Sequence, residues 1–296
     1  MEKAHLLITG SNGLVASQFM AQYGDQYVFD TIDLSNPEHP VDITKLDQVQ
    51  RAVTDSSAAA IIHCAAYTNV TEAWKQQDDR SGTAYQVNVI GTANAAQAAA
   101  ESGKHLVHIS TPYIFDGTFN GLYTEDERPS PIEWYGYTKA EAERVLGESA
   151  ASWTILRIDQ PFRSLPFARP DTVQRIISGL EAGTLPPQFT DHTFGPTFLD
   201  DFSHVLHWAV EQKSQGIFHA TSGEKWTDYD FATAVQKAFG LKGTVQKGSL
   251  TEYLAKSNRP YQKNTALSTE KLVQAMGKQS SIADALAHLR VLLAQL

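Results

Sequence analysis

A tyrosine and a lysine four residues apart, in the stretch WYGYTK, are the residues of this chain whose types and spacing most directly suggest chemistry. In a helix, residues i and i+4 share a face, so Tyr135 pairs with Lys139 while Tyr137 points about 200° away. A nearby ammonium favours the phenolate and lowers the pKa of the tyrosine. The pair could then pass a proton to a carbonyl oxygen while a hydride reaches the carbon. Simple packing of Tyr135 beside a solvated lysine is the alternative.

The residues before this pair carry a helix-start pattern. Ser130, Pro131 and Glu133 supply a cap, a proline at the first helical position and a capping-box acid. They predict a helix over residues 131–148, which would hold Tyr135 and Lys139 on one face.

A hydroxyl group is expected as the third member of the site. Open α/β sheets bind ligands at the carboxyl ends of their strands. Ser110 and Thr111 end the apolar run HLVHIS, and Thr111 could donate a hydrogen bond to the substrate oxygen. A threonine that merely closes a strand is the alternative.

A glycine-rich turn follows the first apolar run, in ITGSNGLVA. Gly10 and Gly13 allow a tight turn and let a pyrophosphate approach the start of a helix over residues 14–23. Ala16 is small enough for close packing of that helix on the strand. A tight strand-to-helix turn that binds nothing is the alternative.

Asp33 ends the second apolar run about 20 residues after Gly10, where a carboxylate can bind the adenosine ribose hydroxyls. A solvated aspartate at a strand end is the alternative. No arginine or lysine stands in GSNG or DLSNPEH, where a 2′-phosphate would need one. NAD is therefore the expected cofactor, with NADP as the alternative. Asp42, with Ile43, could cover the adenine, and Asp42 could also cap the next helix.

Short apolar runs alternate with helix-compatible stretches through the first half of the chain, at residues 5–9, 27–33, 59–64, 105–110 and 154–157. This alternation predicts βαβ units and a parallel sheet buried on both faces. The second half has proline-rich linkers and helices around residues 172–180, 230–239 and 282–296. We therefore expect an α/β fold, a Rossmann-type doubly wound parallel sheet with a smaller C-terminal substrate lobe. The sheet domain would comprise residues 1–158 with 192–220 returning to it, and the lobe mainly 159–191 and 221–296.

Composition narrows the functional classes. A net charge of −9 over 296 residues argues against nucleic acid, which needs a clustered basic face. Cys64 is the single cysteine, so no intrachain disulfide can form, and a reducing cytoplasm is expected. The apolar run in MEKAHLLITG is too short for a signal peptide, and no stretch approaches the roughly 20 apolar residues that span a bilayer. We expect no metal site and no membrane partner.

Together these motifs resemble those of the extended short-chain dehydrogenase/reductase family, most closely its dTDP-4-dehydrorhamnose reductase branch. ITGSNGLVA, IIHCAAYTNVTEAW, ISTPYIFDG, YTEDERPSPIEWYGYTKAEAE and GPTFLDD run in family order. The resemblance implies that Thr111, Tyr135 and Lys139 are catalytic and that Lys139 also binds cofactor. It implies a structural or water-relay role for Asn88. The other expected cofactor contacts are Gly10, Asn12, Gly13, Leu14, Asp33, Asp42 and Ile43, with Ala65, Ala66 and Tyr67 on the nicotinamide side.

Two departures from the family pattern bear on the substrate. Rhamnose reductases usually read S-T-D-Y-V-F, and here Pro112 stands after the threonine. They usually have a tryptophan in T-S-W after I-L-R, where this chain has Gln160. A nucleotide sugar would still find arginines for its diphosphate among Arg157, Arg163, Arg169, Arg175 and Arg259.

The resemblance implies an NAD(P)-dependent reductase or dehydrogenase acting on a carbonyl or alcohol, with a nucleotide-linked 4-keto sugar as a candidate substrate. An NAD-dependent sugar epimerase would use the same tyrosine and lysine. A dinucleotide-binding regulator is the third reading, because this branch also resembles the regulatory subunit of methionine adenosyltransferase. A second copy of the chain is a candidate partner.

Overall fold

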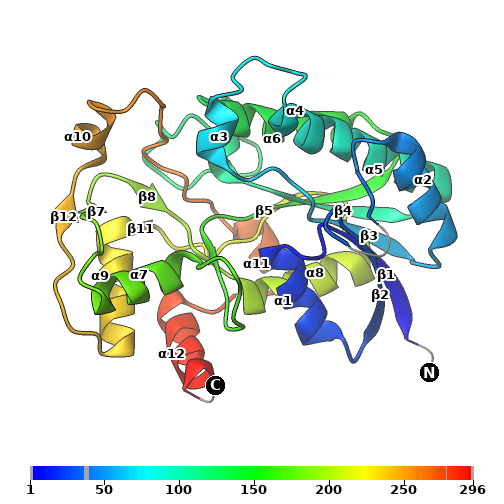
Figure 1. Cartoon of the computed structure of the whole chain (residues 1–296). Helices are drawn as coiled ribbons and strands as arrows, with labels where there is room; N and C mark the ends of the chain where they lie inside the picture. The colour runs from blue at the N-terminus through cyan, green and yellow to red at the C-terminus, as the bar shows by residue number, and fades with distance from the viewer. Residues whose placement is uncertain (1–2, 37–39, 278, 295–296) are drawn as a thin grey trace.

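The computed structural model describes residues 3–36, 40–277 and 279–294. A six-stranded sheet, parallel at every pairing, runs through the larger part of the molecule (Figure 1). From β1 (Ala4–Thr9) the chain continues to β2 (Tyr27–Ile32) at one edge of the sheet, and it then crosses to β3 (Ala60–His63) on the other side of β1. The switch point of the sheet therefore lies between β1 and β3. From edge to edge the strands are β10 (Gly216–His219), β5 (Ser152–Arg157), β4 (His105–Ser110), β3 (Ala60–His63), β1 (Ala4–Thr9) and β2 (Tyr27–Ile32).

Helices cover both faces of this sheet (Figure 1). Alternate residues of a strand point to opposite faces, so Leu6 and Ile8 join one apolar cluster and Leu7 the other. One face carries α1 (Leu14–Tyr23), α8 (Leu199–Gln212) and α11 (Glu270–Met276). The other carries α2 (Leu46–Asp55), α5 (Gly91–Ser102) and α6 (Trp134–Gly147).

A third apolar cluster lies outside the sheet and forms the core of a smaller lobe. It joins α7 (Thr172–Glu181), α9 (Asp228–Phe239) and α12 (Ile282–Leu293), confirming the three helices expected there. The last two residues of the helix expected over 282–296 lie outside the described residues. The exact division into domains stays a prediction.

Short elements connect these layers. In the sheet half they are α3 (Val70–Trp74), α4 (Thr83–Tyr85), a π-helical turn η1 (Gln86–Ile90) and a 3₁₀ turn η2 (Pro112–Ile114). Beyond β5 they are β6 (Pro161–Phe162), β7 (Gln188–Phe189), β8 (Thr193–Phe194), β9 (Thr197–Phe198), β11 (Trp226–Thr227), β12 (Lys247–Gly248) and α10 (Leu250–Leu254).

The sequence expectations for strands were confirmed for β1 to β5. Strand β10 was not among the five predicted runs, although segment 192–220 was expected to return to the sheet domain. β10 is short, with only four residues, and it lies at the edge of the sheet. A short edge strand is half-buried and lacks the continuous apolar run of a central strand.

The predicted start of α6 was wrong by three residues. The helix begins at Trp134, and Ser130 and Pro131 precede it. Glu133 is itself the cap, because its carboxylate accepts hydrogen bonds from the amides of Tyr135 at 2.8 Å and Gly136 at 2.5 Å. The cap residue Glu133 therefore lies two positions before Tyr135, at the start of the helix that carries it.

The expectation that Asp42 caps the next helix was also wrong. Helix α2 begins at Leu46 with Lys45 as its cap residue. The Asp42 carboxylate instead accepts hydrogen bonds from the Thr44 amide and hydroxyl, at 2.9 and 2.7 Å. Such a local turn satisfies the carboxylate before the helix starts.

Within the described ranges, no helix combines the length and the apolar character that crossing a bilayer requires. In the same part of the chain, no group of three or more His, Cys, Asp and Glu side chains is arranged to hold a metal ion.

Candidate functional site

The glycine turn after β1 brings the chain against the end of β3. Gly10 has φ +66°, and a Cβ there would lie 2.7 Å from the backbone of Ala65. Its amide donates to the carbonyl oxygen of Ile32 at 2.7 Å, and its carbonyl accepts from Gly13. Glycine is therefore required at this position by conformation and by space. Helix α1 starts immediately after, with Gly13 at its cap.

We call the hollow beside this turn the glycine cleft. Of the expected cofactor contacts, eight line it together with part of the Leu34–Ser35 turn: Gly10, Asn12, Gly13, Asp33, Asp42, Ile43, Ala65 and Ala66. Leu14 lines the neighbouring cavity instead. Tyr67 lines neither hollow. The Asn88 side chain accepts a hydrogen bond from the Tyr67 amide at 2.7 Å and donates one to its carbonyl at 3.2 Å. Asn88 thus fixes the loop after β3.

Asp33 stands at the rim of the glycine cleft with its carboxylate already ordered. It accepts hydrogen bonds from the Asn12 amide at 3.1 Å and from the Ser35 amide and hydroxyl at 2.8 and 2.6 Å. Partial burial raises the pKa of this carboxyl, but the hydrogen bonds from Ser35 and Asn12 outweigh it, and the net pKa shift is downward. Asp33 therefore presents an ionised carboxylate at the edge of the cleft.

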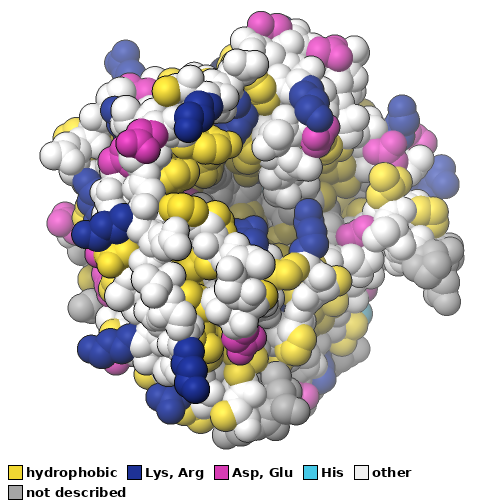
Figure 2. All heavy atoms as spheres, turned by 60° about the vertical axis from the view of Figure 1, so that its left-hand side comes forward, with side chains coloured by type: hydrophobic (Ala, Val, Ile, Leu, Met, Phe, Trp, Pro, Cys, Tyr) yellow, Lys and Arg dark blue, Asp and Glu magenta, His cyan; other side chains and the backbone are white. Residues whose placement is uncertain are grey.

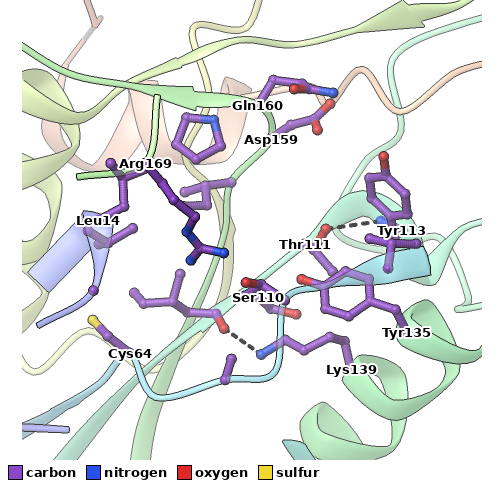
Figure 3. A pocket seen from close by; sticks show the side chains of 18 residues that line it. Leu14, Cys64, Ser110, Thr111, Tyr113, Tyr135, Lys139, Asp159, Gln160 and Arg169 are labelled. Carbon is purple, nitrogen blue, oxygen red and sulfur yellow. Dashed lines mark hydrogen bonds between the residues drawn. The ribbon is translucent and has the colours of Figure 1, made fainter. Parts of the chain in front are cut away.

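The second hollow, which we call the tyrosine cavity, has a volume of about 370 Å³ and brings together Thr111, Tyr135 and Lys139 (Figure 3). Thr111 comes directly after β4, and the other two residues come from α6. The cavity shares Gly13, Cys64 and Ala66 with the glycine cleft, so the two hollows adjoin. In the space-filling view, this side of the molecule is hollowed, with hydrophobic side chains on the walls and Lys and Arg side chains nearby (Figure 2).

Tyr135 and Tyr137 occupy different environments, as helical spacing predicts. Tyr135 is buried against the ring of Tyr113, with ring centroids 5.8 Å apart. Tyr137 stacks on Trp134 at 4.9 Å and accepts a hydrogen bond from exposed Arg80. Tyr135 lines the cavity and Tyr137 does not, so of these two tyrosines it is Tyr135 that can contact a molecule bound there.

Lys139 is almost fully buried beneath the cavity. Its Nζ donates to the carbonyl oxygen of Ile109 at 2.7 Å and to Nε2 of His108 at 3.1 Å. Burial lowers the pKa of Lys139 to about 8, although Glu143 and Cys64 act in the opposite direction. His108 stacks on His63, and both imidazole pKa values are lowered by burial and by the Lys139 charge.

The expected lowering of the Tyr135 pKa by Lys139 was wrong for this structure. Burial raises the pKa of Tyr135 well above its usual value, and the Glu133 carboxylate adds to the rise. The Thr111 side chain acts in the opposite direction. The Lys139 ammonium is instead directed at Ile109 and His108. The phenol therefore keeps its proton at neutral pH and is prepared to act as a donor.

The five arginines considered for binding a diphosphate differ in whether a ligand in the cavity could reach them. Arg157 is buried and donates two hydrogen bonds to Glu143, at 3.0 and 2.6 Å. Arg163 is buried and donates to the Leu14 carbonyl and the Ser17 hydroxyl. Arg157 is therefore not available for a ligand, and its expected role was wrong. Arg175 and Arg259 do not line the cavity, whereas exposed Arg169 does.

The two departures from the family pattern fall in different places. Gln160 lines the tyrosine cavity, but Pro112 is buried in η2 and does not. Tyr113 occupies the cavity wall instead.

Asp159 also lines the cavity, although it was not among the site residues predicted from the sequence. It lies in the stretch IDQP, where the chain departs from the family pattern and no motif marks the residue. A polar residue directly after a buried strand was the available signal.

This fold and site define a class, the extended short-chain dehydrogenases/reductases. The model of the RmlD substrate binding domain family matches residues 4–290, nearly the whole chain. The chain belongs to this family.

Named relatives agree with this assignment. A dTDP-4-dehydrorhamnose reductase from Aggregatibacter actinomycetemcomitans is 31% identical, over 94% of this chain and 95% of the relative. Methionine adenosyltransferase 2 subunit beta from Mus musculus is 28% identical, over 90% of this chain and 81% of the relative. Among solved structures, dTDP-4-dehydrorhamnose reductase from Bacillus anthracis in complex with NADP has a TM-score of 0.88 at 26% identity, covering 98% of this chain and 99% of that one.

Proposed function

We propose that this protein is an NAD(P)-dependent oxidoreductase that transfers hydride between a nicotinamide and a carbonyl or alcohol. The observation that carries the proposal is the convergence of Thr111, Tyr135 and Lys139 in a cavity that adjoins the glycine cleft. The relatives named as reductases, and the solved structure with NADP, support the same activity.

The glycine cleft fits a dinucleotide on its own geometry. The close approach of Gly10 to Ala65 leaves a smooth backbone surface where a side chain would intrude. The amino end of α1 opens beside it, and helix amino ends favour phosphate. Asp33 would accept from the ribose hydroxyls, which favours NAD, with NADP as the alternative. When bound, the cofactor supplies or accepts the hydride.

The protein's own groups would manage the proton and the oxygen. Tyr135 holds a proton on its phenol oxygen and would donate it to the substrate oxygen. Thr111 would donate a hydrogen bond to the same oxygen. Lys139 lies beneath the cavity floor, where its ammonium would donate to the hydroxyls of the cofactor ribose and hold the cofactor in place. Apolar side chains on the cavity walls, among them Leu14, Val15 and Ile158, would limit access of water.

We infer that the substrate is a nucleotide-linked 4-keto sugar such as dTDP-4-dehydrorhamnose. The reductase relatives support this class, and Arg169 supplies an exposed guanidinium at the cavity wall for a diphosphate. A cytoplasmic location and a second copy as partner stay predictions.

A substrate panel tests the proposal directly. Oxidation of NADH and NADPH is measured with dTDP-4-dehydrorhamnose and with simple ketones. We expect turnover of the nucleotide sugar, and Arg169→Ala should raise the KM for it more than the KM for a simple ketone. Arg175→Ala is the matched control, because Arg175 lies outside the cavity. Absence of turnover with every carbonyl would contradict the proposal.

A dinucleotide-binding regulatory subunit is the second candidate function. The similarity to methionine adenosyltransferase 2 subunit beta covers 90% of this chain and favours it. Capture of a stoichiometric partner from the source cell, together with no turnover in the substrate panel, would select this candidate over the reductase.

A further inference from the structure

Asp159 is a buried carboxylate placed at the reacting end of the sheet. It follows β5 by two residues, next to the end of β4 that carries Thr111, and the amide of Ile158 donates to the carbonyl of Ser110 at 3.1 Å. Its side chain lines the tyrosine cavity although the residue is only 3% exposed. Among the described residues lining that cavity, it is the one carboxylate.

The Asp159 carboxylate is held by neutral donors. The Thr265 hydroxyl donates to Oδ2 at 2.6 Å and the Gly195 amide at 3.3 Å. Both of these donors bind Oδ2. A carboxylate offers about four acceptor positions, so these two donors leave acceptor capacity, including that of Oδ1, for a ligand.

No lysine or arginine within the described ranges forms an ion pair with Asp159. Burial raises the pKa of this carboxyl to about 6, while Thr265 and His192 act in the opposite direction. A buried carboxyl without a cationic partner destabilises a fold, and such groups are concentrated at functional sites.

The chain directly after Asp159 is held in an unusual conformation. Gln160 has φ +39°, in the left-handed region that disfavours a side chain with a Cβ. Its Oε1 accepts a hydrogen bond from the Thr172 hydroxyl at 3.0 Å. This backbone conformation lies at the cavity wall, and strained residues gather at ligand sites.

Asp159 and the catalytic candidates approach the cavity from different sides. Figure 3 shows Asp159 and Gln160 on one wall, with Tyr135 and Lys139 on another and Tyr113 between them. A substrate whose carbonyl oxygen meets Tyr135 and Thr111 would therefore turn an adjacent ring position toward Asp159. A hydroxyl group there would find an acceptor.

We propose that Asp159 orients the substrate by accepting a hydrogen bond from a hydroxyl on the carbon next to the reacting carbonyl, and that it selects hydroxylated ketones over plain ones. This inference rests on the proposed reductase activity and specifies its substrate class. In this arrangement Tyr135 and Thr111 donate hydrogen bonds to the carbonyl oxygen of the substrate, and Asp159 accepts a hydrogen bond from the neighbouring hydroxyl.

The test compares two substrates in each variant, because a ratio within one protein does not depend on how much of it is folded. The first pair is dTDP-4-dehydrorhamnose and its analogue without the hydroxyl on C3. The second pair is 2-hydroxycyclohexanone and cyclohexanone. Asp159→Asn should lower the hydroxylated-to-deoxy ratio of kcat/KM about ten- to a hundredfold, the effect of losing a hydrogen bond to a charged group. Affinity for NADH should not change.

Asp171→Asn is the matched control. Asp171 is another buried aspartate, and it caps α7 by accepting from the amides of Gln174 and Arg163 outside the cavity. Its variant should lose thermal stability without changing the substrate ratio.

Three outcomes separate the possibilities. A lowered ratio in Asp159→Asn alone supports the proposal. An unchanged ratio, with both substrates slowed equally or the melting temperature lowered, would mean that Asp159 only braces Thr265 and Gly195, and would overturn it. Wild-type protein that reduces neither member of either pair would overturn the proposed function and this inference with it.

Discussion

The two adjoining hollows are built in different ways. The glycine cleft is built on the β1–α1 turn and the end of β2, closed by the residues that follow β3, and its shape depends on backbone conformation and small residues. The wall around Asp159 joins segments near residues 113, 160, 195 and 265, which the fold alone brings together. The glycine turn that shapes the first hollow is thus a local feature of the sequence, whereas the wall around Asp159 depends on long-range packing.

The largest expected effect comes from Tyr135→Phe, which removes the proton donor from the substrate side. Turnover should fall about 10²- to 10⁴-fold, the usual contribution of a positioned acid. NADH affinity, measured by quenching of tryptophan fluorescence, should stay nearly unchanged because the glycine cleft is intact. Tyr137→Phe is the control and should change turnover little. Normal turnover by the Tyr135 variant would show that the proton comes from elsewhere.

Gly10→Ala tests whether the cofactor side depends on backbone conformation. The new Cβ would combine a positive φ with a 2.7 Å contact to Ala65, and should lower the free energy of unfolding by about 2 to 4 kcal/mol and weaken NADH binding. Gly103 has φ +65° with no atom within 4 Å of its Cβ position. Gly103→Ala should therefore cost only about 1 to 2 kcal/mol. If urea unfolding shows the same loss of unfolding free energy for both variants, the contact with Ala65 does not contribute to the effect of Gly10→Ala.

Glu133 allows a pH test at the base of α6. Burial raises its pKa to about 7 from an ordinary 4.5, although the amides of Gly136 and Tyr135 and the Arg259 charge lower it. Because the folded pKa exceeds the unfolded one, this group favours folding below pH 4.5 and that contribution is lost as the pH rises through 7.

Glu133→Gln should remove this pH dependence. Relative to wild type, the stability of the variant should rise by about 1 to 3 kcal/mol between pH 4.5 and pH 7.5, measured by urea unfolding at each pH. A difference that stays constant across this window would mean that folding does not raise the pKa of Glu133. Glu141→Gln is the control, because Glu141 is a half-buried residue of the same helix that forms an ion pair with Arg144 away from the cap.

The smallest expected effect concerns cofactor choice. Asp33→Asn should weaken NADH about tenfold by removing the charged acceptor for the ribose hydroxyls, with less change for NADPH. Asp30→Asn is the control, since Asp30 lies on β2 outside the cleft and binds the Ser56 hydroxyl. Titration of wild type with both cofactors is decisive, and tighter binding of NADPH would contradict the preference assigned to Asp33.

Much of the sheet and part of the site were predictable because they depend on local patterns. Apolar runs located β1 to β5, and the glycine spacing located the turn and α1. Helical spacing separated Tyr135 from Tyr137. Prediction from local sequence failed where more than one residue could cap the same helix. Ser130 and Pro131 match the pattern of a helix start, but Glu133 is the residue that caps α6.

The sequence by itself determined the α/β alternation, the dinucleotide turn and the Tyr135–Lys139 pair, because each depends on neighbours within a few residues. Only the tertiary structure decided which arginine remains available to bind a diphosphate. Arg157 forms a buried ion pair with Glu143, whereas Arg169 lines the cavity. It also decided that Asp159 faces the cavity and that Lys139 points at Ile109 and His108. These facts depend on burial and on partners distant in the chain, which residue order alone does not place.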